Sequence, residues 1–293
     1  MQKLVYVKPN GDYGNPDDCV SLKFGTPFIL AELTGVGGVE KTFVTAEVGN
    51  VDGTLVQHIR TEAREVPASV WVCGSDQAEM YANRFKLISA LSNTQQPGTL
   101  YYSNDYITVK ADAYPLLPGD FSDRVKNYNK CNIKFYCPYP FWSDTEPMAT
   151  EMSYHIEENA FSFPLVWQDT VCFAENSTTT VVYCNSSEPT PVTITLAGNL
   201  ISPIVKNETT QEQIEIADVE LNDGDSLTIS TKKGAKSVTL YKDGVTTDAF
   251  NLVTPTSVFW QLQPGKNVIT YTSNKGITAA TLVLSYYNLY GGV

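Results

Sequence analysis

The chain has 293 residues, of which 42% are hydrophobic and 18% are charged, and its formal net charge is −12. This composition can bury a substantial core, which excludes a disordered chain, and the length predicts two domains. The negative charge argues against nucleic acid as a partner, because affinity for a phosphate backbone comes largely from Lys and Arg. No apolar stretch approaches the roughly 20 residues that cross a bilayer, and the first apolar run is too short for a signal peptide. We therefore expect no membrane span and no secretion by the usual route.

The first 74 residues show the alternation of apolar and polar residues that is typical of β-strands. Strands are predicted over 20–34 and 43–48, and Asp52-Gly53 predicts a hairpin turn between 43–48 and a long strand-like run over 54–74. Pro67 lies inside that run and predicts a sheet edge or a bend there, because proline has no N–H for the ladder.

The period then changes to that of a helix. Ser75 or Asp76 can cap it, and acidic residues follow in the first turn, so a helix is predicted over 76–92. It is the only convincing helical pattern in the chain. The apolar residues that fit one helical stripe are Met80, Tyr81, Phe85, Leu87, Ile88 and Leu91.

Strands resume over 98–115, around a Ser-Asn-Asp turn, and over 124–138. In the second of these, Cys131, Ile133, Phe135 and Cys137 alternate and are predicted to share one face.

The stretch KFYCPYPFW, residues 134–142, ends that strand. Pro138 and Pro140 stop the pairing and stiffen an extended exit, and Phe141 and Trp142 can anchor the exit against a domain surface. We interpret Pro138, Pro140, Phe141 and Trp142 as an interdomain seam.

Residues 143–151 have the composition of a linker. Beyond them no helix is predicted, and short strands recur at intervals of about ten residues with turn residues between them, a pattern typical of a β-sandwich or jelly roll. The predicted domains are therefore 1–140, with strands and the helix, and 141–293, with strands alone.

Side chains that could carry chemistry are scarce. The two histidines, His58 and His155, are isolated, and no nucleophile, zinc or phosphate-loop motif is present. The six cysteines have no CxxC spacing and are interpreted as free, mostly buried thiols. We predict no catalytic residue, no metal and no cofactor. Acidic loops at 15–19 and 221–230 are interpreted as turns, since further calcium ligands are missing.

Two surface features stay open to a second interpretation. The sequons at Asn176, Asn185 and Asn207 match the glycosylation pattern, which is common by chance. The aromatic residues favour core or interface packing, although a carbohydrate groove is an alternative. They include Tyr101, Tyr102, Tyr106, Tyr136, Tyr139, Phe141, Trp142, Trp167, Phe259 and Trp260.

Taken together, four stretches of the second half resemble the distal tail protein (Dit) family of long-tailed siphophages. They are PVTITLAGNLISPIVKNETT (191–210), LNDGDSLTISTKKG (221–234), FWQLQPGKNVITYT (259–272) and SYYNLYGGV (285–293). In the first half, the Val-Asp-Gly hairpin at 51–53 and the single helix after a strand ending in Cys-Gly fit the same family. The resemblance extends over essentially the whole chain.

This resemblance implies a mainly β protein that is structural and not an enzyme. The N-terminal domain would be a β-sandwich with one α-helix and a protruding hairpin, and it would form a hexameric ring. The C-terminal domain would be a galectin-like β-sandwich of the jelly-roll type. The implied partners are the tail tube protein, a tail-associated lysin or tail-tip spike, and a receptor-binding protein. The implied location is the tail tip of the virion, after synthesis in the host cytoplasm.

A ring needs strand edges or surfaces that pair across subunits, and the 43–72 hairpin offers them. We therefore hypothesise that Arg60, Glu62, Arg64 and Glu65 lie at or near an inter-subunit interface.

Two other classes of function remain. The chain could be a carbohydrate-binding adhesion module, which glycan binding by the C-terminal domain would reveal, or a cell-wall glycosidase, which would need a convergent pair of carboxylates. Residues 191–293 contain no His and no Arg, which sugar sites on such sandwiches usually use, so we predict no tight glycan binding there.

Overall fold

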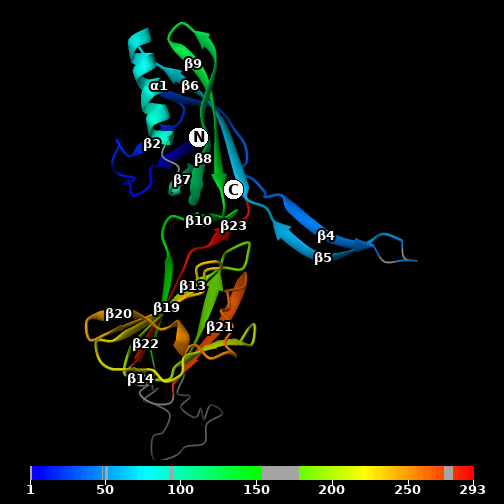
Figure 1. The fold of residues 1–293 in the computed structure, drawn as a ribbon, viewed down its shortest axis with the longest axis vertical. Coiled ribbons are helices and arrows are strands. Elements are labelled where there is room, and N and C mark those ends of the chain that lie inside the picture. Colours follow the sequence, from blue (N-terminus) through cyan, green and yellow to red (C-terminus); the bar gives the residue numbers. More distant parts are fainter. Residues whose placement is uncertain (1, 48, 50–51, 93–94, 154–177, 274–279) are drawn as a thin grey trace, which may run out of the picture. The chain divides into compact units, whose positions relative to one another are not determined.

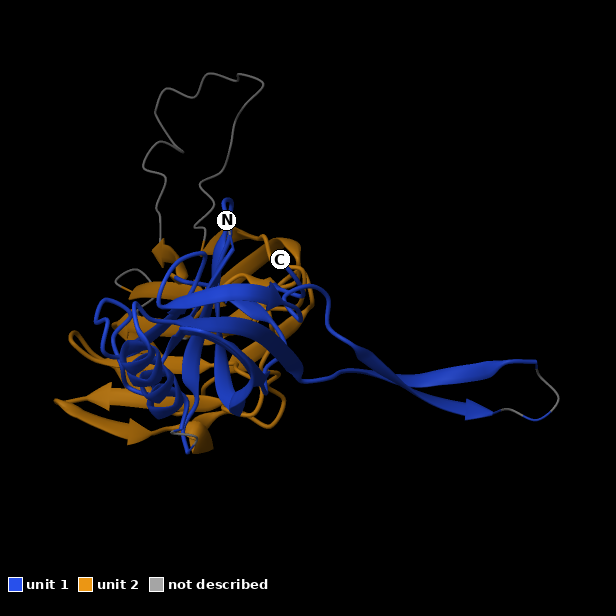
Figure 2. Ribbon diagram, turned by 90° about the horizontal axis from the view of Figure 1, so that it is seen from above, with its two compact units in different colours: residues 1–145, 290–293 blue, residues 146–289 orange. Residues whose placement is uncertain are grey.

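The computed structural model describes residues 2–47, 49, 52–92, 95–153, 178–273 and 280–293. It is mainly β with one α-helix, which confirms the predicted fold class. The chain forms two compact units, coloured separately in Figure 2: unit 1 comprises residues 1–145 and 290–293, and unit 2 comprises residues 146–289. The functional domains 1–140 and 141–293 remain a prediction.

Unit 1 is built on a nine-stranded antiparallel sheet whose main path runs β2-β1-β7-β8-β9-β6-β3. Its long strand β8 serves two neighbours, because its first part pairs with β7 and the part from Tyr114 onward pairs with β9. Short β10 pairs with β8 and with β23. The strands are β1 Lys3–Val7, β2 Cys19–Leu22, β3 Phe28–Leu33, β6 Arg64–Cys73, β7 Gly98–Ser103, β8 Thr108–Val125, β9 Tyr128–Cys137, β10 Trp142–Asp144 and β23 Leu289–Tyr290.

The core of unit 1 follows the alternation in the sequence. Cys131, Ile133, Phe135 and Cys137 of β9 are all buried on one face, as predicted. Alternate residues of the neighbouring β6, from Val66 to Val72, are buried beside them. Because side chains of a strand point to opposite faces in turn, these residues of β6 and β9 share one face of the sheet and belong to the core of the unit.

The predicted helix is α1, Gln77–Leu91, and it packs against β2, β6 and β8. Asp76 is its N-cap: the Asp76 carboxylate accepts a hydrogen bond from the Glu79 N–H at 2.8 Å, and the Glu79 carboxylate accepts one from the Ser75 N–H at 2.7 Å. This reciprocal pair satisfies amides that would otherwise lack partners at the helix start.

The predicted apolar stripe of α1 is only partly correct. Met80, Leu87 and Leu91 are buried, but Tyr81 and Phe85 are exposed, Phe85 by 72%. The polar residue Asn83 takes a buried position instead, where its amide donates to the Cys73 carbonyl at 2.8 Å.

The long run predicted over 54–74 is two strands, β5 Thr54–Thr61 and β6, separated at residues 62–63. Pro67 lies within β6, between β9 and β3 in the strand order, but the ladder with β3 ends at Leu33, opposite Ala68. Pro67 thus lies just past the end of β3, where a missing N–H is tolerated as it is at a sheet edge, and its carbonyl accepts from the Thr34 N–H at 3.1 Å.

Unit 2 is a sandwich of a six-stranded sheet, ordered β11-β22-β13-β18-β19-β20, and a four-stranded sheet, ordered β12-β21-β15-β16. A small pair, β14 and β17, and a 3-10 turn at Phe250–Leu252 complete it. The strands are β11 Met148–Ser153, β12 Thr179–Cys184, β13 Val192–Gly198, β14 Leu200–Ile201, β15 Ile204–Asn207, β16 Glu212–Glu215, β17 Glu220–Leu221, β18 Ser226–Ser230, β19 Ser237–Lys242, β20 Val245–Asp248, β21 Gly265–Thr272 and β22 Ala280–Tyr286.

The segment 143–151, predicted to be a linker, instead holds the end of β10 and most of β11. Its polar composition suits strands with exposed faces, and β11 buries only Met152. The turn in YKDGV joins β19 to β20, with Asp243 at φ 54° and Gly244 at φ 79°, as a tight hairpin between right-twisted strands requires.

Candidate functional site: an exposed arm and its root

Strands β4, Lys41–Glu47, and β5 form a separate two-stranded sheet that projects from the rest of unit 1 (Figure 1). We call residues 41–61 the arm. The arm confirms the protruding hairpin of the predicted fold. A two-stranded hairpin is at best marginally stable in water, so an arm of this length needs contacts from elsewhere.

Apolar side chains lie on both faces of the arm. Phe43 pairs with Ile59, and after a bulge between Val44 and Thr45 the pairing continues with Thr45 opposite Val56 and Ala46 opposite Leu55. Partners in a ladder share a face. One face therefore carries Phe43, Val56 and Ile59, and the other carries Val44, Ala46 and Leu55.

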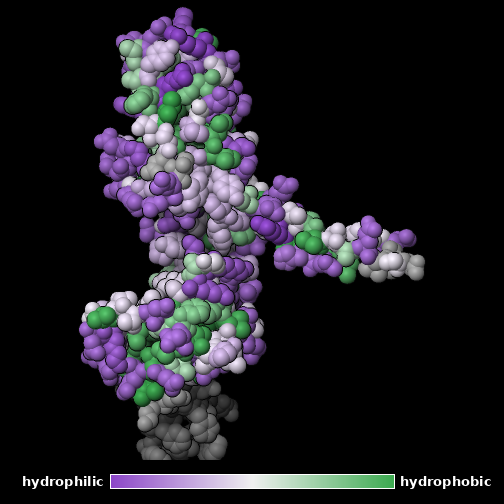
Figure 3. All heavy atoms as spheres, in the orientation of Figure 1, coloured by the Kyte–Doolittle hydropathy of each residue, from purple (hydrophilic) through white to green (hydrophobic). Residues whose placement is uncertain are grey.

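These side chains are not covered within the chain. Phe43, Val44, Leu55, Val56 and Ile59 are between 47% and 59% exposed. Figure 3 shows apolar residues along the visible face of the arm, between polar ones. Several large apolar side chains exposed together on one element are typical of a protein–protein contact.

The four residues predicted for an inter-subunit interface lie at the end of the arm and just beyond it. Arg60 is exposed, and its Nε lies 3.9 Å from a Glu62 carboxylate oxygen. Glu65 is exposed and pairs with Lys134 at 2.7 Å. These two ion pairs are solvated, so each contributes little to stability and leaves its charges accessible.

Arg64 is different, because its side chain is buried and only 3% exposed. Its guanidinium donates four hydrogen bonds to backbone carbonyls: Nε to Pro140 at 2.7 Å, Nη1 to Gly35 at 2.6 Å and Gly37 at 2.7 Å, and Nη2 to Gly291 at 2.7 Å. It also lies over the Trp142 ring, 5.4 Å from the centroid. Burial lowers the pKa of Arg64 from its ordinary value.

Arg64 therefore does not offer these donors to a neighbouring subunit, and its place near an inter-subunit interface stays a prediction. Its donors are used inside unit 1, and its side chain is not available to a neighbouring subunit. The sequence pattern misled because a charged residue in an alternating run is usually solvated, whereas a planar guanidinium can replace water with carbonyl groups.

The residues that connect the arm to the sheet, 34–40 and 62–65, form what we call the arm root. A hollow of about 540 Å³ lies there, lined by Gly35, Gly38, Val39, Glu40, Glu62, Ala63, Arg64, Glu65 and Tyr136. The Glu62 N–H donates to the Glu40 carbonyl at 3.0 Å, which ties the two legs of the arm together. Three glutamates and Arg64 line this hollow, and two of the glutamates lie beside cations: Glu62 by Arg60 and Glu65 by Lys134.

The residues of the predicted interdomain seam all belong to unit 1. Trp142 is fully buried and its Nε1 donates to the Val36 carbonyl at 3.2 Å. Pro140 is buried, Pro138 is exposed, and Phe141 makes an edge-on contact with Tyr139. These positions fit an extended, anchored exit from β9. The role as a seam stays a prediction.

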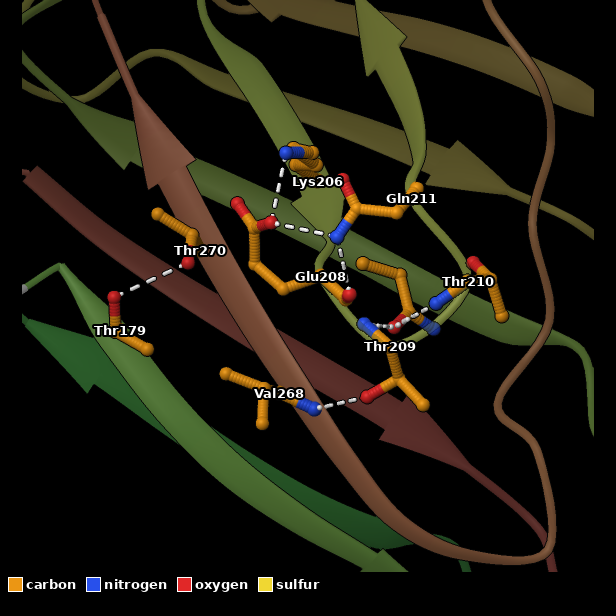
Figure 4. A network of polar contacts seen from close by, with 9 residues as sticks. Thr179, Lys206, Glu208, Thr209, Thr210, Gln211, Val268 and Thr270 are labelled. Atoms are coloured by element: carbon orange, nitrogen blue, oxygen red, sulfur yellow. Dashed lines mark hydrogen bonds and ion pairs between the residues drawn. The ribbon is translucent and has the colours of Figure 1, made fainter.

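Unit 2 presents a polar network on the outer face of its four-stranded sheet (Figure 4). Lys206 and Glu208 form an ion pair at 2.7 Å, Gln211 donates to the Glu208 carbonyl at 2.6 Å, and the hydroxyls of Thr179 and Thr270 lie 3.1 Å apart. The bond to Lys206 lowers the pKa of Glu208. Lys206, Glu208 and Gln211 hold the turn between β15 and β16, whereas Thr179 and Thr270 face each other across β12 and β21.

Asn207 supports that turn from below. It is fully buried, and its side-chain oxygen accepts from the Thr209 and Thr210 amides at 3.0 and 3.4 Å. A buried side chain cannot accept a glycan in the folded protein. Asn207 therefore stabilises the turn and is not a glycosylation site.

Elsewhere the described residues offer little chemistry. Cys19, Cys73, Cys131, Cys137 and Cys184 are free thiols, and His58 is exposed on the arm. Within the described ranges no group of three His, Cys, Asp or Glu side chains could hold a metal, and no helix could span a membrane. His155, Trp167, Cys172 and Asn176 lie outside the described residues.

Sequence reasoning missed the glycines that make the arm root. Gly35 has φ 79°, and a Cβ there would lie 2.0 Å from the Glu65 carbonyl oxygen. The clusters GVGG at 35–38 and GG at 291–292 were the available signal, since glycine permits close approach of two backbones.

Comparison with known proteins identifies two family models in order along the chain. Residues 18–137 match the phage tail protein RIFT-related domain, and residues 184–289 match the C-terminal domain of the siphovirus-type tail component. Together they span most of the chain. Comparison with curated proteins gives no match.

Solved structures share the fold across the whole length. The Dit protein of phage SPP1, described as a hub of the adsorption apparatus in phages that infect Gram-positive bacteria, superposes with a TM-score of 0.69 at 13% identity, covering 98% of this chain and 99% of that one. Chains of the phage p2 baseplate in its activated conformation, with Ca and with Sr, give TM-scores of 0.54 and 0.53 at 10% identity, each covering 100% of this chain and 99% of the other.

The two matched domains, their order and the fold agree with one another. They make this chain a phage tail component, and hence part of a virion. The protein belongs to the distal tail protein (Dit) family of siphophages.

Proposed function

We propose that the protein assembles into a hexameric ring at the tail tip, that the ring joins the tail tube to the tail-tip spike or tail-associated lysin, and that it serves as a hub for the proteins of host adsorption, including a receptor-binding protein. The single observation that carries the proposal is the arm: a two-stranded hairpin with apolar side chains on both faces. The family supports the same role, since its members are tail components.

In this proposal residues 1–140 form the ring and residues 141–293 point to the adsorption proteins. The arm of one subunit lies against its neighbour. Arg60, Glu62 and Glu65 lie near the same contact, where their accessible charges set orientation and encounter rate more than affinity. Burial of the arm side chains supplies the affinity, at about 25 cal/mol per Å² of apolar surface removed from water.

The arm is tested with one variant for each face. Phe43→Ser with Ile59→Ser changes the first face, and Val44→Ser with Leu55→Ser changes the second. Native mass spectrometry and negative-stain microscopy of the full chain are expected to show a closed six-fold ring for the original protein and smaller species for both variants. Val245→Ser is the matched control, since Val245 is 58% exposed on β20, outside the arm.

Either of two results contradicts the proposal. The original chain could stay monomeric over the range of concentrations in which rings would form, or both arm variants could assemble as well as the Val245→Ser control. Immunogold labelling of intact phage then tests the location, with label expected at the distal end of the tail.

The charged residues are tested separately. Arg60→Glu is expected to slow ring assembly, and the effect is expected to shrink as salt rises towards 1 M, where charge interactions are screened beyond about 3 Å. An assembly rate equal to that of the original chain at low salt would remove Arg60 from the interface.

A further inference from the structure

The last four residues of unit 1, Tyr290–Val293, return to the sheet from which the arm projects. We call them the strap. Tyr290 lies in β23, which pairs with β10, and its hydroxyl donates to the Asp144 carboxylate at 2.9 Å. The Val293 N–H donates to the Val36 carbonyl at 3.2 Å, and Gly291 accepts from Arg64. The strap is therefore held at each end and in the middle.

Contact between the strap and the arm root is made by backbone against backbone. A Cβ on Gly292 would lie 2.6 Å from the Gly37 carbonyl carbon and 2.8 Å from the Gly38 nitrogen. Real Cβ atoms do not approach backbone so closely, so only glycine fits at this position without a shift of the main chain. The packing of the strap and the arm root is thus specific to these two glycine clusters.

Arg64 connects the arm root to the strap. It is the first residue of β6, so it follows directly on the returning leg of the arm, and its Nη1 holds Gly35 and Gly37 on the outgoing leg. Its Nη2 holds Gly291 of the strap. One planar side chain therefore links both legs of the arm to the strap, with a geometry that a guanidinium imposes and an ammonium would not.

We infer that the strap is a conformational device that fixes the arm root: with the strap seated the arm leaves the sheet in one defined direction, and with the strap displaced the root loosens while the sheet stays folded. A hinge of this kind has its mobility set by a few residues at the ends of elements. The expected effect of the strap on ring assembly rests on the proposed function. The expected effect of the strap on the mobility of the arm root does not.

Hydrogen–deuterium exchange of the full chain tests the inference with two single-glycine variants. Gly292→Ala forces a Cβ into the Gly37–Gly38 backbone. Gly38→Ala is the matched control, because a Cβ there meets nothing within 4 Å and the residue lies in the same loop. The root is monitored through the amides of Thr34 and Glu62, which donate to Pro67 and Glu40. The amides of α1 report on the sheet and its core.

In Gly292→Ala, exchange at Thr34 and Glu62 is expected to rise at least tenfold while exchange in α1 stays as in the original chain. Gly38→Ala is expected to change neither. Root exchange that stays slow in Gly292→Ala would overturn the inference, and so would a uniform rise that includes α1, since the strap would then be an ordinary part of the core. Arg64→Lys is a second test and is expected to give the same selective rise.

Ring assembly is measured on the same samples. If the original chain forms rings, Gly292→Ala is expected to form fewer than Gly38→Ala, and equal amounts would overturn the part of the inference that concerns assembly. A chain that forms no rings contradicts the proposed function instead, and the exchange results still decide whether the strap fixes the root.

Discussion

Arg64 and Glu65 are adjacent in the chain, but they are expected to contribute very differently to the free energy of unfolding. Arg64→Met leaves carbonyls of Pro140, Gly35, Gly37 and Gly291 without their donor. An unsatisfied buried group costs about 1–3 kcal/mol, so we expect Arg64→Met to lower the free energy of unfolding by more than about 3 kcal/mol. Glu65→Ala removes only an exposed ion pair and is expected to cost less than about 1 kcal/mol. Urea denaturation of both variants measures the difference, and equal losses would contradict the account of Arg64.

Three buried acids of unit 1 predict a loss of stability in alkali. Burial raises the pKa of Cys131 and of Cys137 from 9.0 to about 12, and that of Tyr6 from 10.0 to about 12. The folded chain therefore keeps these protons while the unfolded chain releases them. Stability is fully present below pH 9 and is expected to fall as pH rises from 9 to 12.

The measurement is the free energy of unfolding as a function of pH, from pH 7 to pH 12. In Cys137→Ala one of the three groups is gone, so the curve is expected to start lower at pH 7, because of the cavity, and to fall less steeply above pH 9. A slope unchanged by the substitution would show that Cys137 does not keep its proton in the fold.

Among the elements, α1 has an N-cap whose contribution to stability can be measured. Asp76→Ala removes the N-cap acceptor of the Glu79 amide and is expected to cost about 1 kcal/mol of stability. Ser89→Ala, at an exposed position of the same helix, is the control and is expected to be neutral or slightly stabilising, because alanine has the higher helix propensity. Thermal unfolding followed by circular dichroism compares them, and a similar melting point for both would show that the cap contributes nothing.

The sequence could predict those features of the elements that depend on residues close together in the chain. The helix limits and the buried face of β9 both rest on local periods, and both agree with the structure. The failures share a different cause. Which side of α1 is covered depends on β2, β6 and β8, so Phe85 was assigned to the wrong side.

The arm and its root show the same limit at the candidate site. The Asp52-Gly53 turn between two strand-like runs predicted a hairpin, and its protrusion was expected only from the resemblance to the Dit family. The burial of Arg64 could not be predicted, because its partners come from residues 35, 37, 140 and 291, and only the folded chain brings these together. Long-range carbonyl contacts leave no pattern in a single sequence beyond the glycines that permit them.

For the whole molecule, unit 1 is discontinuous in the chain and unit 2 is continuous. A cut at the predicted limit, after residue 140, removes Trp142, which is fully buried, together with the strap. A cut after residue 145 keeps Trp142 and removes only the strap. Loss of a buried Trp costs about 3–5 kcal/mol. Fragment 1–140 is therefore expected to be less stable than unit 1 in the full chain, whereas 1–145, which loses only the strap, is expected to unfold close to unit 1 in the full chain with its arm root loosened.

Fragment 146–289 is the internal comparison. It contains every strand of both sheets of unit 2 and all the residues of its core, so it is expected to keep a cooperative unfolding transition on its own. Chemical denaturation of the three fragments, each followed by circular dichroism, gives the order of stability. If 1–140 and 1–145 unfold at the same denaturant concentration, Trp142 does not hold the end of the β9 exit against the sheet. If 1–145 also unfolds well below unit 1 in the full chain, the strap is an ordinary part of the core of unit 1 and does not act on the arm root alone.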